Sequence, residues 1–383
     1  MQRRNLKTLD SSNASTTDPV ASIDTWAARS NYWLERSQPK KSRRRRRREQ
    51  NPLFLTGHGL SIRVDKGCLT IRDGNTHYPA EERTWRFFNG SLDIPPALVV
   101  IDGSGEITMD ALDWLATQEV SLIRLRWDGQ FISVVSTGGQ AASFEKVYWQ
   151  ERTRKDPVAR LKFASNLIRE KAHYTATTLE NHVPRSATWE RAMQHIKGRI
   201  RLLERREPRT IRELLGIEGT IAAEYFRAWS AIKLDWRIAK RHPIPDEWKK
   251  YTSRAAIREN SYRNYRATHP VNAMLNYAYG VLTARKQIQL IGDGYDPMIG
   301  ILHDRSNEPG SRPAFVLDHM EPMRPVVDRA VLEIVTKEAL SGSDFSIQHD
   351  GACRLNPELA RHVAQLALQH YAAVSDTEWL RLK

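Results

Sequence analysis

The spacing of apolar residues changes near residue 145, and this change constrains the fold more than any other feature of the chain. Before it, apolar and polar residues alternate in short segments, which is typical of half-buried strands. After it, apolar residues recur at the spacing of long helices. We therefore predict an α+β protein in which a small β-rich domain, residues 51–145, precedes a larger all-helical domain, residues 146–383.

Two hairpins are predicted in the first domain. Residues 59–74 alternate on both sides of a turn at 65–67, and residues 120–136 alternate around a turn at 128–129. The other elements predicted there are a buried strand at 95–105 and a short helix at 109–118. The clearest helical patterns of the second domain are at 157–182, 210–233 and 269–288.

Residues 1–50 are rich in Ser, Thr, Asp and Arg, and we predict a disordered basic extension there. The run KKSRRRRRR at 40–48 carries eight positive charges, so the rest of the chain holds 14 − 8 = +6. Such a surplus favours a polyanionic partner such as nucleic acid, although a solvated tail or linker is an equal alternative for the run. Within this extension Trp26, Tyr32, Trp33 and Leu34 are compatible with a short docking helix.

The cysteines and the apolar segments indicate where the protein resides. Cys68 and Cys353 are far apart, which fits a reducing compartment and gives no zinc-ligand spacing. No segment approaches the ~18 apolar residues of a membrane helix, and the N-terminus lacks an apolar signal core. We expect a soluble, cytoplasmic protein without membrane contact.

Glu218 has an unusual position in the helical pattern of residues 210–233. At about 100° per residue it falls within the apolar stripe of that helix. The stripe comprises Ile211, Leu214, Leu215, Ile221, Ala222, Tyr225, Trp229 and Ile232. A buried carboxylate needs a partner, which is a metal ion, a proton or, in the structural alternative, a cationic side chain such as arginine. Gly216 and Gly219 flank it, which suggests close approach by another element or by a ligand.

A histidine and two acids follow apolar runs in residues 294–325: His303, Asp318 and Glu321. Acids at i and i+3 lie on one face of a helix, and histidine with carboxylates suits Mn²⁺ or Mg²⁺. The alternatives are a helix capping box formed by Asp318 and Glu321, and a histidine that caps a helix or bonds within the core. His319 is a competing ligand, but as a neighbour of Asp318 it points elsewhere on a helix.

Two basic stretches are candidates for contact with DNA. One is the helix around Lys197, Arg199 and Arg201. In the other, residues 240–266, aromatic and basic residues are interleaved: Trp248, Tyr251, Tyr262 and Tyr265 with Arg254, Arg258, Arg263 and Arg266. Aromatic rings can stack on bases while the cations meet phosphates. A solvated helix pair is the alternative.

Three segments together resemble the CRISPR-associated spacer-acquisition endonuclease and integrase family. They are LLGIEGTIAAEYF (214–226), HPVNAMLNYAYGVL (269–282), and GYDPMIGILH with FVLDHMEPMRPVVDRA (294–303 and 315–330). The residues of these segments, their order and their spacing all match the family. The segment VSLIRLRWDGQ (120–130) is similar to the family's N-terminal domain. The likeness covers roughly residues 52–340.

The resemblance implies a catalytic Mg²⁺ or Mn²⁺ centre formed by Glu218, His303 and Glu321, with Asp318 as a further metal-binding acid. Asn272 matches a recurrent asparagine of the family. The chain departs from the family pattern in its N-terminal extension and at Pro322, where relatives continue the helix.

The resemblance also implies an activity and partners. The family inserts spacer DNA into a repeat array, in CRISPR adaptation, by attack of a 3′-hydroxyl on a phosphodiester. It acts on double-stranded DNA as a homodimer, which joins a small second CRISPR-associated adaptation protein in a hetero-hexamer.

Two other functions remain as alternatives. One is a stand-alone branched-DNA nuclease or transposon integrase of the same fold. Such integrases usually carry an extra C-terminal DNA-binding module, and the chain ends soon after its last helical pattern at 361–383. The other alternative is a catalytically silent DNA-binding scaffold subunit, against which the complete set of metal-ligand positions argues.

Overall fold

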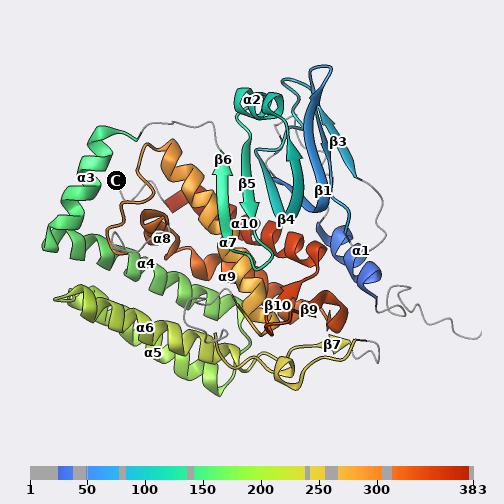
Figure 1. Ribbon diagram of the computed structural model, residues 1–383. Helices are drawn as coiled ribbons and strands as arrows, with labels where there is room; N and C mark the ends of the chain where they lie inside the picture. The colour runs from blue at the N-terminus through green and yellow to red at the C-terminus, as the bar shows by residue number, and fades with distance from the viewer. Residues whose placement is uncertain are drawn as a thin grey trace, which may run out of the picture.

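A sheet lies at one end of the molecule and a larger group of helices fills the rest (Figure 1). The computed structural model describes residues 25–37, 49, 51–76, 83–135, 142–237, 242–254, 266–303 and 313–378. All six strands of the large sheet precede residue 136, and long helices dominate from residue 144 onward. The predicted α+β class is therefore confirmed.

The sheet has six strands in the order β3-β2-β1-β4-β5-β6. Their bounds are β1 (Leu53–Asp65), β2 (Cys68–Arg72), β3 (Thr84–Phe87), β4 (Ala97–Ile107), β5 (Ser121–Leu125) and β6 (Phe131–Val135). Central β4 runs parallel to β1 and β5, while the β1–β2 and β5–β6 pairs are antiparallel. Both predicted hairpins are confirmed, and the first turns through Lys66 and Gly67, whose φ angles are 49° and 77°.

Each face of the sheet is covered by a different layer. Helix α2 (Met109–Thr117) packs on one face, where Leu55, Leu98 and Trp114 share a core. On the other face Val99 and Ile123 join the main core of the helical part. Neighbouring residues of β4 point to opposite faces, and its first five residues are all buried because both faces are covered.

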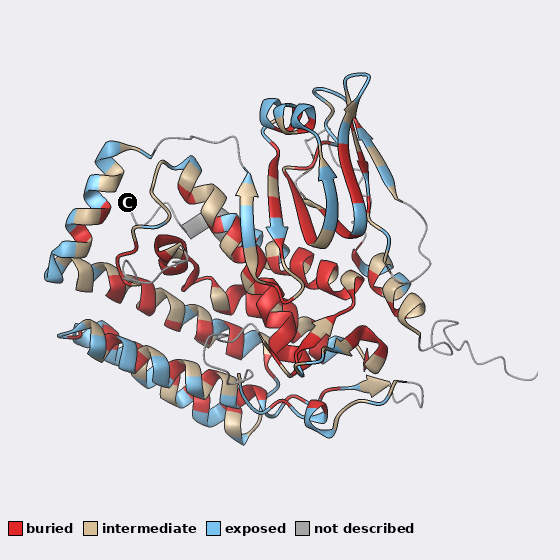
Figure 2. Cartoon of the chain, in the orientation of Figure 1, coloured by how far each residue is buried: buried red, intermediate tan, exposed pale blue. Residues whose placement is uncertain are grey.

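Helices α7 and α9 run through the middle of the helical part and are buried on most sides (Figure 2). The helices there are α3 (Phe144–Lys155), α4 (Pro157–His182), α5 (Ala187–Arg205), α6 (Ile211–Trp229), α7 (Pro270–Gly292), α8 (Ala314–Met320), α9 (Arg324–Lys337) and α10 (Pro357–Glu378). The three predicted helices are α4, α6 and α7. Across the described ranges, no helix is both long and apolar enough to cross a membrane.

Four short strands interrupt the part that the sequence predicted as all-helical. They are β7 (Trp236–Arg237), β8 (Leu340–Ser341), β9 (Phe345–Ile347) and β10 (Cys353–Leu355), and they form two small sheets. Strands of two or three residues are too short to show a periodicity of two. The domain boundaries at residues 50 and 145 stay predictions.

The sheet contacts the helices through a close approach of two glycines. Gly129, in the β5–β6 turn with φ +79°, lies against α7 at Gly280. A Cβ at either position would clash with backbone atoms of the other segment. Glycine is required at 129 both for its positive φ and for this contact.

Helix α1 (Trp26–Ser37) docks on the C-terminal part of the chain. Arg29 forms two hydrogen bonds with Asp344, at 2.6 Å from Nε and 2.8 Å from Nη2, and Trp33 donates to the same carboxylate at 3.1 Å. The predicted docking helix is confirmed. Of residues 1–50, only 25–37 and 49 are described, so the arginine run at 40–48 lies outside the described residues.

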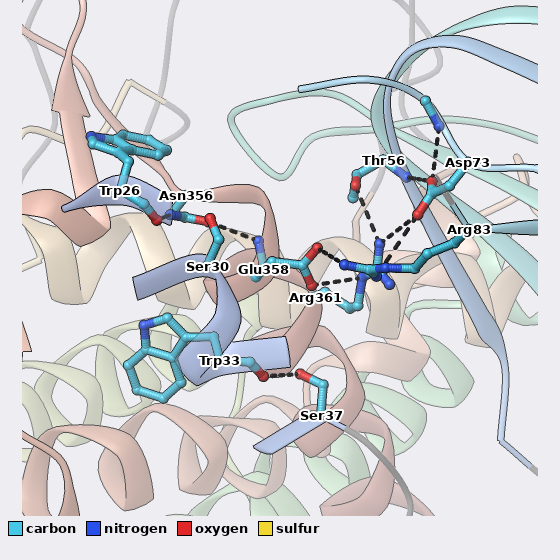
Figure 3. Close-up of polar contacts among 11 residues, drawn as sticks. Trp26, Ser30, Trp33, Ser37, Thr56, Asp73, Arg83, Asn356, Glu358 and Arg361 are labelled. Atoms are coloured by element: carbon cyan, nitrogen blue, oxygen red, sulfur yellow. Dashed lines mark hydrogen bonds and ion pairs between the residues drawn. The ribbon is translucent and has the colours of Figure 1, made fainter. Parts of the chain in front are cut away.

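A polar network attaches α10 to the β1–β3 side of the sheet (Figure 3). The Arg361 guanidinium donates to Thr56 Oγ1 at 3.2 Å and to Asp73 Oδ2 at 3.1 Å. Arg83 donates to Glu358 of α10 at 2.8 Å. The sheet and α10 are therefore joined by buried and half-buried polar contacts.

Candidate functional site

Helix α6 presents Glu218 at the edge of its buried stripe. The side chain of Thr210 caps the helix by accepting from the Glu213 amide at 3.1 Å. The buried residues of α6 are Leu214, Ile217, Ile221, Tyr225, Ala228 and Trp229. The Glu218 side chain is 22% exposed, so it faces both the core and an opening. Leu215, predicted within the stripe, is 43% exposed, so the stripe is centred nearer Ile217 than the sequence suggested.

Gly216 and Gly219 lie on the exposed side of α6. Within 4 Å of a Cβ at either position there is no atom of the described residues. No other element among the described residues approaches these glycines, and approach by a ligand stays a prediction. Each glycine costs the helix about 1 kcal/mol relative to alanine, and no packing contact offsets that cost.

Glu321 lies at the junction of α8 and α9. It is the C-terminal cap of α8 with φ −53° and ψ −49°, and its side chain is 6% exposed. Pro322 is accommodated in the turn that leads into α9. The capping-box alternative is wrong, because Asp318 lies inside α8 and the N-cap of α9 is Met323, without a side-chain cap.

The fully buried carboxylate of Asp318 organises the segment that carries His303. Its Oδ2 accepts from the amides of Ile301 at 2.6 Å and Leu302 at 3.0 Å, and its Oδ1 accepts from the His303 amide at 2.9 Å. Oδ1 also lies 2.7 Å from Nδ1 of His303. The other ring nitrogen, Nε2, then faces Glu321 Oε1 at 3.9 Å. This contact fixes the orientation of the ring, as carboxylates do for metal-binding histidines.

Lys171 of α4 joins the two glutamates. Its Nζ lies 2.6 Å from Glu321 Oε2 and also binds Glu218 Oε1, and its side chain is only 12% exposed. The three predicted ligands are thus brought into one cluster, with an ammonium between the two carboxylates. Sequence reasoning missed Lys171, although it lies at helical spacing between the buried Ile168 and Thr175 of α4.

Opposite charges keep this cluster ionised. Burial alone would raise the pKa of Glu321, but the Arg324 guanidinium at 3.1 Å, with Lys171 and His303, outweighs it and lowers that pKa to about 2. Burial alone would lower the pKa of Lys171, but Glu321 and Glu218 outweigh it and raise that pKa. At neutral pH the buried Lys171 ammonium therefore faces an ionised Glu321 carboxylate.

A cavity of about 520 Å³ opens beside the cluster, between α4, α6, α7 and α9. Lys171 and Glu218 lie on its wall, and Asp328 lies deeper. The Asp328 carboxylate accepts from Tyr225 at 3.1 Å and from Tyr279 at 2.7 Å. Burial raises the pKa of Asp328 to about 6, which makes it a second buried acid near the predicted ligands.

The predicted DNA-binding arginines have different surroundings. Arg254 lines the cavity, donates to Asn276 at 3.1 Å and packs over the Tyr279 ring at 4.8 Å. Arg266 pairs with Asp350. Arg258 and Arg263 lie outside the described residues, as do Tyr262 and Tyr265.

Two aromatic residues predicted to stack on bases are buried instead. Trp248 is 3% exposed and donates to the Thr268 carbonyl at 2.8 Å. Tyr251 is 1% exposed and donates to Asn272 at 3.3 Å. Base stacking on these two rings is therefore wrong, because both belong to the core.

Asn272 and His319 both have structural surroundings. The Asn272 amide donates to the Ser253 carbonyl at 3.0 Å and so fixes the segment that carries Arg254. His319 lies 4.5 Å from the Phe315 ring, and burial lowers its pKa to about 3. The His319 ring therefore lies among aromatic side chains, and its exclusion from the ligand set stays a prediction.

Glu218, His303 and Glu321 suit a divalent ion, but Lys171 binds the carboxylate oxygens that the ion would use. Across the described part of the chain, no three His, Cys, Asp or Glu side chains are arranged to hold a metal ion. The reason is visible in the contacts, since Lys171 lies between Glu218 and Glu321. Two carboxylates and an oriented imidazole nitrogen are nevertheless suitable ligands for Mg²⁺ or Mn²⁺ once the ammonium moves.

A comparison with protein families gives one match that spans most of the chain. The family model described as CRISPR associated protein Cas1 matches residues 53–368. The matched range contains the whole sheet and every residue of the cluster, and it leaves out α1.

Curated relatives agree with this match. The chain is 27% identical over 324 residues to a CRISPR-associated exonuclease Cas4/endonuclease Cas1 fusion of Geobacter sulfurreducens, covering 79% of this chain and 50% of that protein. It is 25% identical over 330 residues to CRISPR-associated endonuclease Cas1 1 of Methanospirillum hungatei, covering 83% and 87%. The chain thus spans half the length of the fusion relative and most of the second.

Solved structures share the fold. A casposase bound to integration product superposes with a TM-score of 0.66 at 25% identity, covering 84% of this chain and 82% of that one. A Cas6-RT-Cas1–Cas2 complex gives a TM-score of 0.63 at 19% identity, covering 89% and 34%. The second likeness shows the fold alone.

Proposed function

The chain belongs to the Cas1 family of CRISPR-associated proteins, and from this premise we propose that it is a divalent-metal-dependent DNA endonuclease and integrase. In this proposal it inserts spacer DNA into a repeat array during CRISPR adaptation, a form of antiviral defence. Curated relatives named as endonucleases and the likeness to a casposase on its integration product support this activity.

One observation links the proposed enzymatic activity to particular residues. Glu218 and Glu321 come from separate parts of the chain and meet at a single ammonium, while Nε2 of His303 faces Glu321. Two carboxylates held close together away from water destabilise the folded state unless a cation binds them. The same three residues are those that the sequence predicted as ligands.

Each residue of the cluster has a role in the proposed chemistry. Glu218, His303 and Glu321 would hold Mg²⁺ or Mn²⁺, which supplies a Lewis acid for the phosphoryl oxygens and lowers the pKa of the attacking hydroxyl. Asp318 holds Nδ1 of His303, so that Nε2 is left to act as a donor atom.

Phosphate recognition is proposed for the cavity beside the cluster. Arg254 lies on its wall, and its Nη1 atom is buried without a hydrogen-bond partner among the described residues. Guanidinium groups bind phosphate through paired N–H donors. A DNA strand that enters this cavity would place a phosphodiester next to Glu218.

The reaction proposed is a direct transesterification. The 3′-hydroxyl of the incoming DNA attacks a phosphodiester of the repeat, a new phosphodiester forms, and the displaced strand leaves with a 3′-hydroxyl. Water in place of the hydroxyl gives nuclease activity, and the reverse reaction resolves a branched DNA. The chain provides positioning and charge, and no covalent enzyme intermediate is required.

The proposed assembly is a homodimer that binds double-stranded DNA together with a small second CRISPR-associated protein. The Cas6-RT-Cas1–Cas2 complex of the same fold supports such a partner, and the hetero-hexamer is part of the proposal. A direct test is an integration assay with the purified protein, its small partner and a supercoiled repeat-bearing plasmid. We expect Mg²⁺- or Mn²⁺-dependent joining of a labelled duplex at the repeat, and the absence of both joining and cleavage would overturn the proposal.

The casposase likeness also favours a second candidate, integration by a transposon enzyme. The same assay separates the two candidates. Efficient joining without the small partner, at targets that lack a repeat, favours the transposon integrase. Joining that needs both the partner and the repeat favours CRISPR adaptation.

A further inference from the structure

We propose that Lys171 is an internal competitor of the metal ion: its ammonium holds Glu218 and Glu321 together until the ion binds, and it must leave when the ion enters. The inference rests on the proposed function, because it presupposes that these carboxylates bind a divalent ion. It assigns a role to a residue outside the predicted ligand set.

The contacts of Lys171 give the first argument. Its Nζ binds Oε1 of Glu218 and lies 2.6 Å from Oε2 of Glu321. These are oxygen atoms that the metal ion would need, and an ammonium and an ion cannot share the same lone pairs at bonding distance. The absence of a preformed three-ligand site in the described residues follows from this arrangement.

The charges give the second argument. The two glutamates contribute two negative charges, which Lys171 and Arg324 already balance. A divalent ion added to this balanced set would find both carboxylates already neutralised and would be repelled by the two neighbouring cations. Departure of one cation removes that repulsion. Arg324 contacts Glu321 through Nη2 of a rigid, planar guanidinium, whereas Lys171 is a single charge on a flexible stem.

The cavity gives the third argument, because it offers the ammonium a place to go. Lys171 borders the cavity of about 520 Å³, on the same wall as Glu218. Its stem can swing into this space without displacing the backbone of α4. There the ammonium would join Arg254 near the path proposed for the DNA strand, so that ion binding would move a positive charge toward the phosphates.

The test is a titration of the full-length protein with Mn²⁺, in which free Mn²⁺ is measured by electron paramagnetic resonance. Lys171→Met removes the charge and keeps most of the apolar stem. We expect it to bind Mn²⁺ at least about tenfold more tightly than the unmodified protein. Lys171→Gln should change the affinity in the same direction and covers the case in which the methionine variant does not fold.

A matched control is available on the same helix. Lys162 is exposed on α4, away from the cluster, and Lys162→Met removes the same charge. Its Mn²⁺ affinity should equal that of the unmodified protein. Lys171→Arg should bind Mn²⁺ no more tightly than the unmodified protein, because a guanidinium can clamp carboxylates through paired hydrogen bonds.

Thermal unfolding gives a second test of the role of Lys171. In EDTA, Lys171→Met should unfold at a lower temperature than the unmodified protein, because the buried Glu321 and the half-buried Glu218 lose the ammonium that they share. Saturating Mn²⁺ should then raise its unfolding temperature by more than it raises that of the unmodified protein. Lys162→Met should show neither difference.

The outcomes distinguish this inference from the proposed function. If Mn²⁺ binding requires His303 but is unchanged or weaker in both Lys171→Met and Lys171→Gln, the metal centre stands and the competition is refuted. If His303→Ala binds Mn²⁺ as the unmodified protein does, the proposed centre itself fails and the inference falls with it.

Discussion

Nδ1 of His303 lies 2.7 Å from Oδ1 of Asp318, and the same buried carboxylate accepts hydrogen bonds from three consecutive backbone amides. Asp318 therefore fixes both the ring and the chain segment that carries it. All of its recorded contacts point toward residues 301–303. This geometry favours an orienting role, and its predicted role as a direct metal ligand stays a prediction.

Asp318→Asn should weaken the metal centre without touching the ion. An amide nitrogen cannot accept from the backbone amides, so one or two buried donors lose a partner, at about 1–3 kcal/mol each. We expect Mn²⁺ affinity and strand transfer to fall by about 10–100-fold. Asp246→Asn is a matched control, since Asp246 is 88% exposed and pairs with Lys249 at the surface. Unchanged affinity in Asp318→Asn would contradict the orienting role.

Asp328 should make the stability of the protein depend on pH. Burial raises its pKa from 3.8 to about 6, against the opposing effects of Tyr279, Arg254, Tyr225 and Arg324. The folded state therefore holds this proton more tightly than the unfolded state. Stability should fall as the pH rises from about 4 to about 6, and the loss should be constant above that range.

Asp328→Asn isolates this contribution. The difference between 3.8 and about 6 corresponds to about 3 kcal/mol. Relative to the unmodified protein, the variant should gain up to that amount between pH 4 and pH 7 in urea unfolding. Parallel stability curves for the two proteins across this range would show that Asp328 does not titrate there.

Helix α5 carries exposed basic residues in one of the two stretches predicted to contact DNA. It packs beside α6 (Figure 1). Its exposed residues include four cations, Arg191, Lys197, Arg201 and Arg205. Replacing Lys197 and Arg201 by glutamine should weaken duplex binding. The slope of log affinity against log salt should become shallower by about 1.8, because two phosphate contacts are lost.

The control for this prediction replaces two lysines that are already paired. Lys155 and Lys337 contact Glu151 at 3.5 Å and Glu333 at 2.8 Å, and both lie outside the two basic stretches. Their replacement by glutamine removes the same charge from the protein and should leave the slope nearly unchanged. Equal slopes in both double variants would show that α5 makes no specific phosphate contacts.

Helix α1 should contribute strongly to stability although it lies outside the range matched by the family. Arg29 and Asp344 are both almost fully buried, so Arg29→Ala leaves an unpaired buried carboxylate and should cost about 3–5 kcal/mol in denaturant unfolding. Arg36→Ala removes an exposed pair with Glu338 at 2.9 Å and should cost less than about 1 kcal/mol. Equal losses would contradict the docked arrangement of α1.

The sequence predicted those elements whose signal is local. The turns at 65–67 and 128–129 and helix α4 follow from residue type and spacing, and the structure has them at these positions. Glu218 could be singled out because a carboxylate at a buried helical position is unusual. Helical spacing alone could not show that Leu215 is exposed, because only tertiary packing decides which part of an apolar stripe is covered.

The other differences between the predicted and the observed site also arise from tertiary packing. Trp248 and Tyr251 lie among cationic residues in the sequence, yet both are covered by segments distant in the chain. Lys171 carries the same signal as Glu218, a charge at a buried helical position, but its partners come from two other helices. A sequence pattern identifies the unusual residue, whereas the fold decides what it contacts.

The central claim is that Glu218, His303 and Glu321 form one catalytic metal centre. Its most direct test is Mn²⁺-dependent cleavage and joining of labelled DNA by Glu218→Gln and His303→Ala, with thermal unfolding in EDTA measured alongside. We predict that both variants remain folded and lose cleavage and joining together. Full activity in both folded variants would contradict the claim.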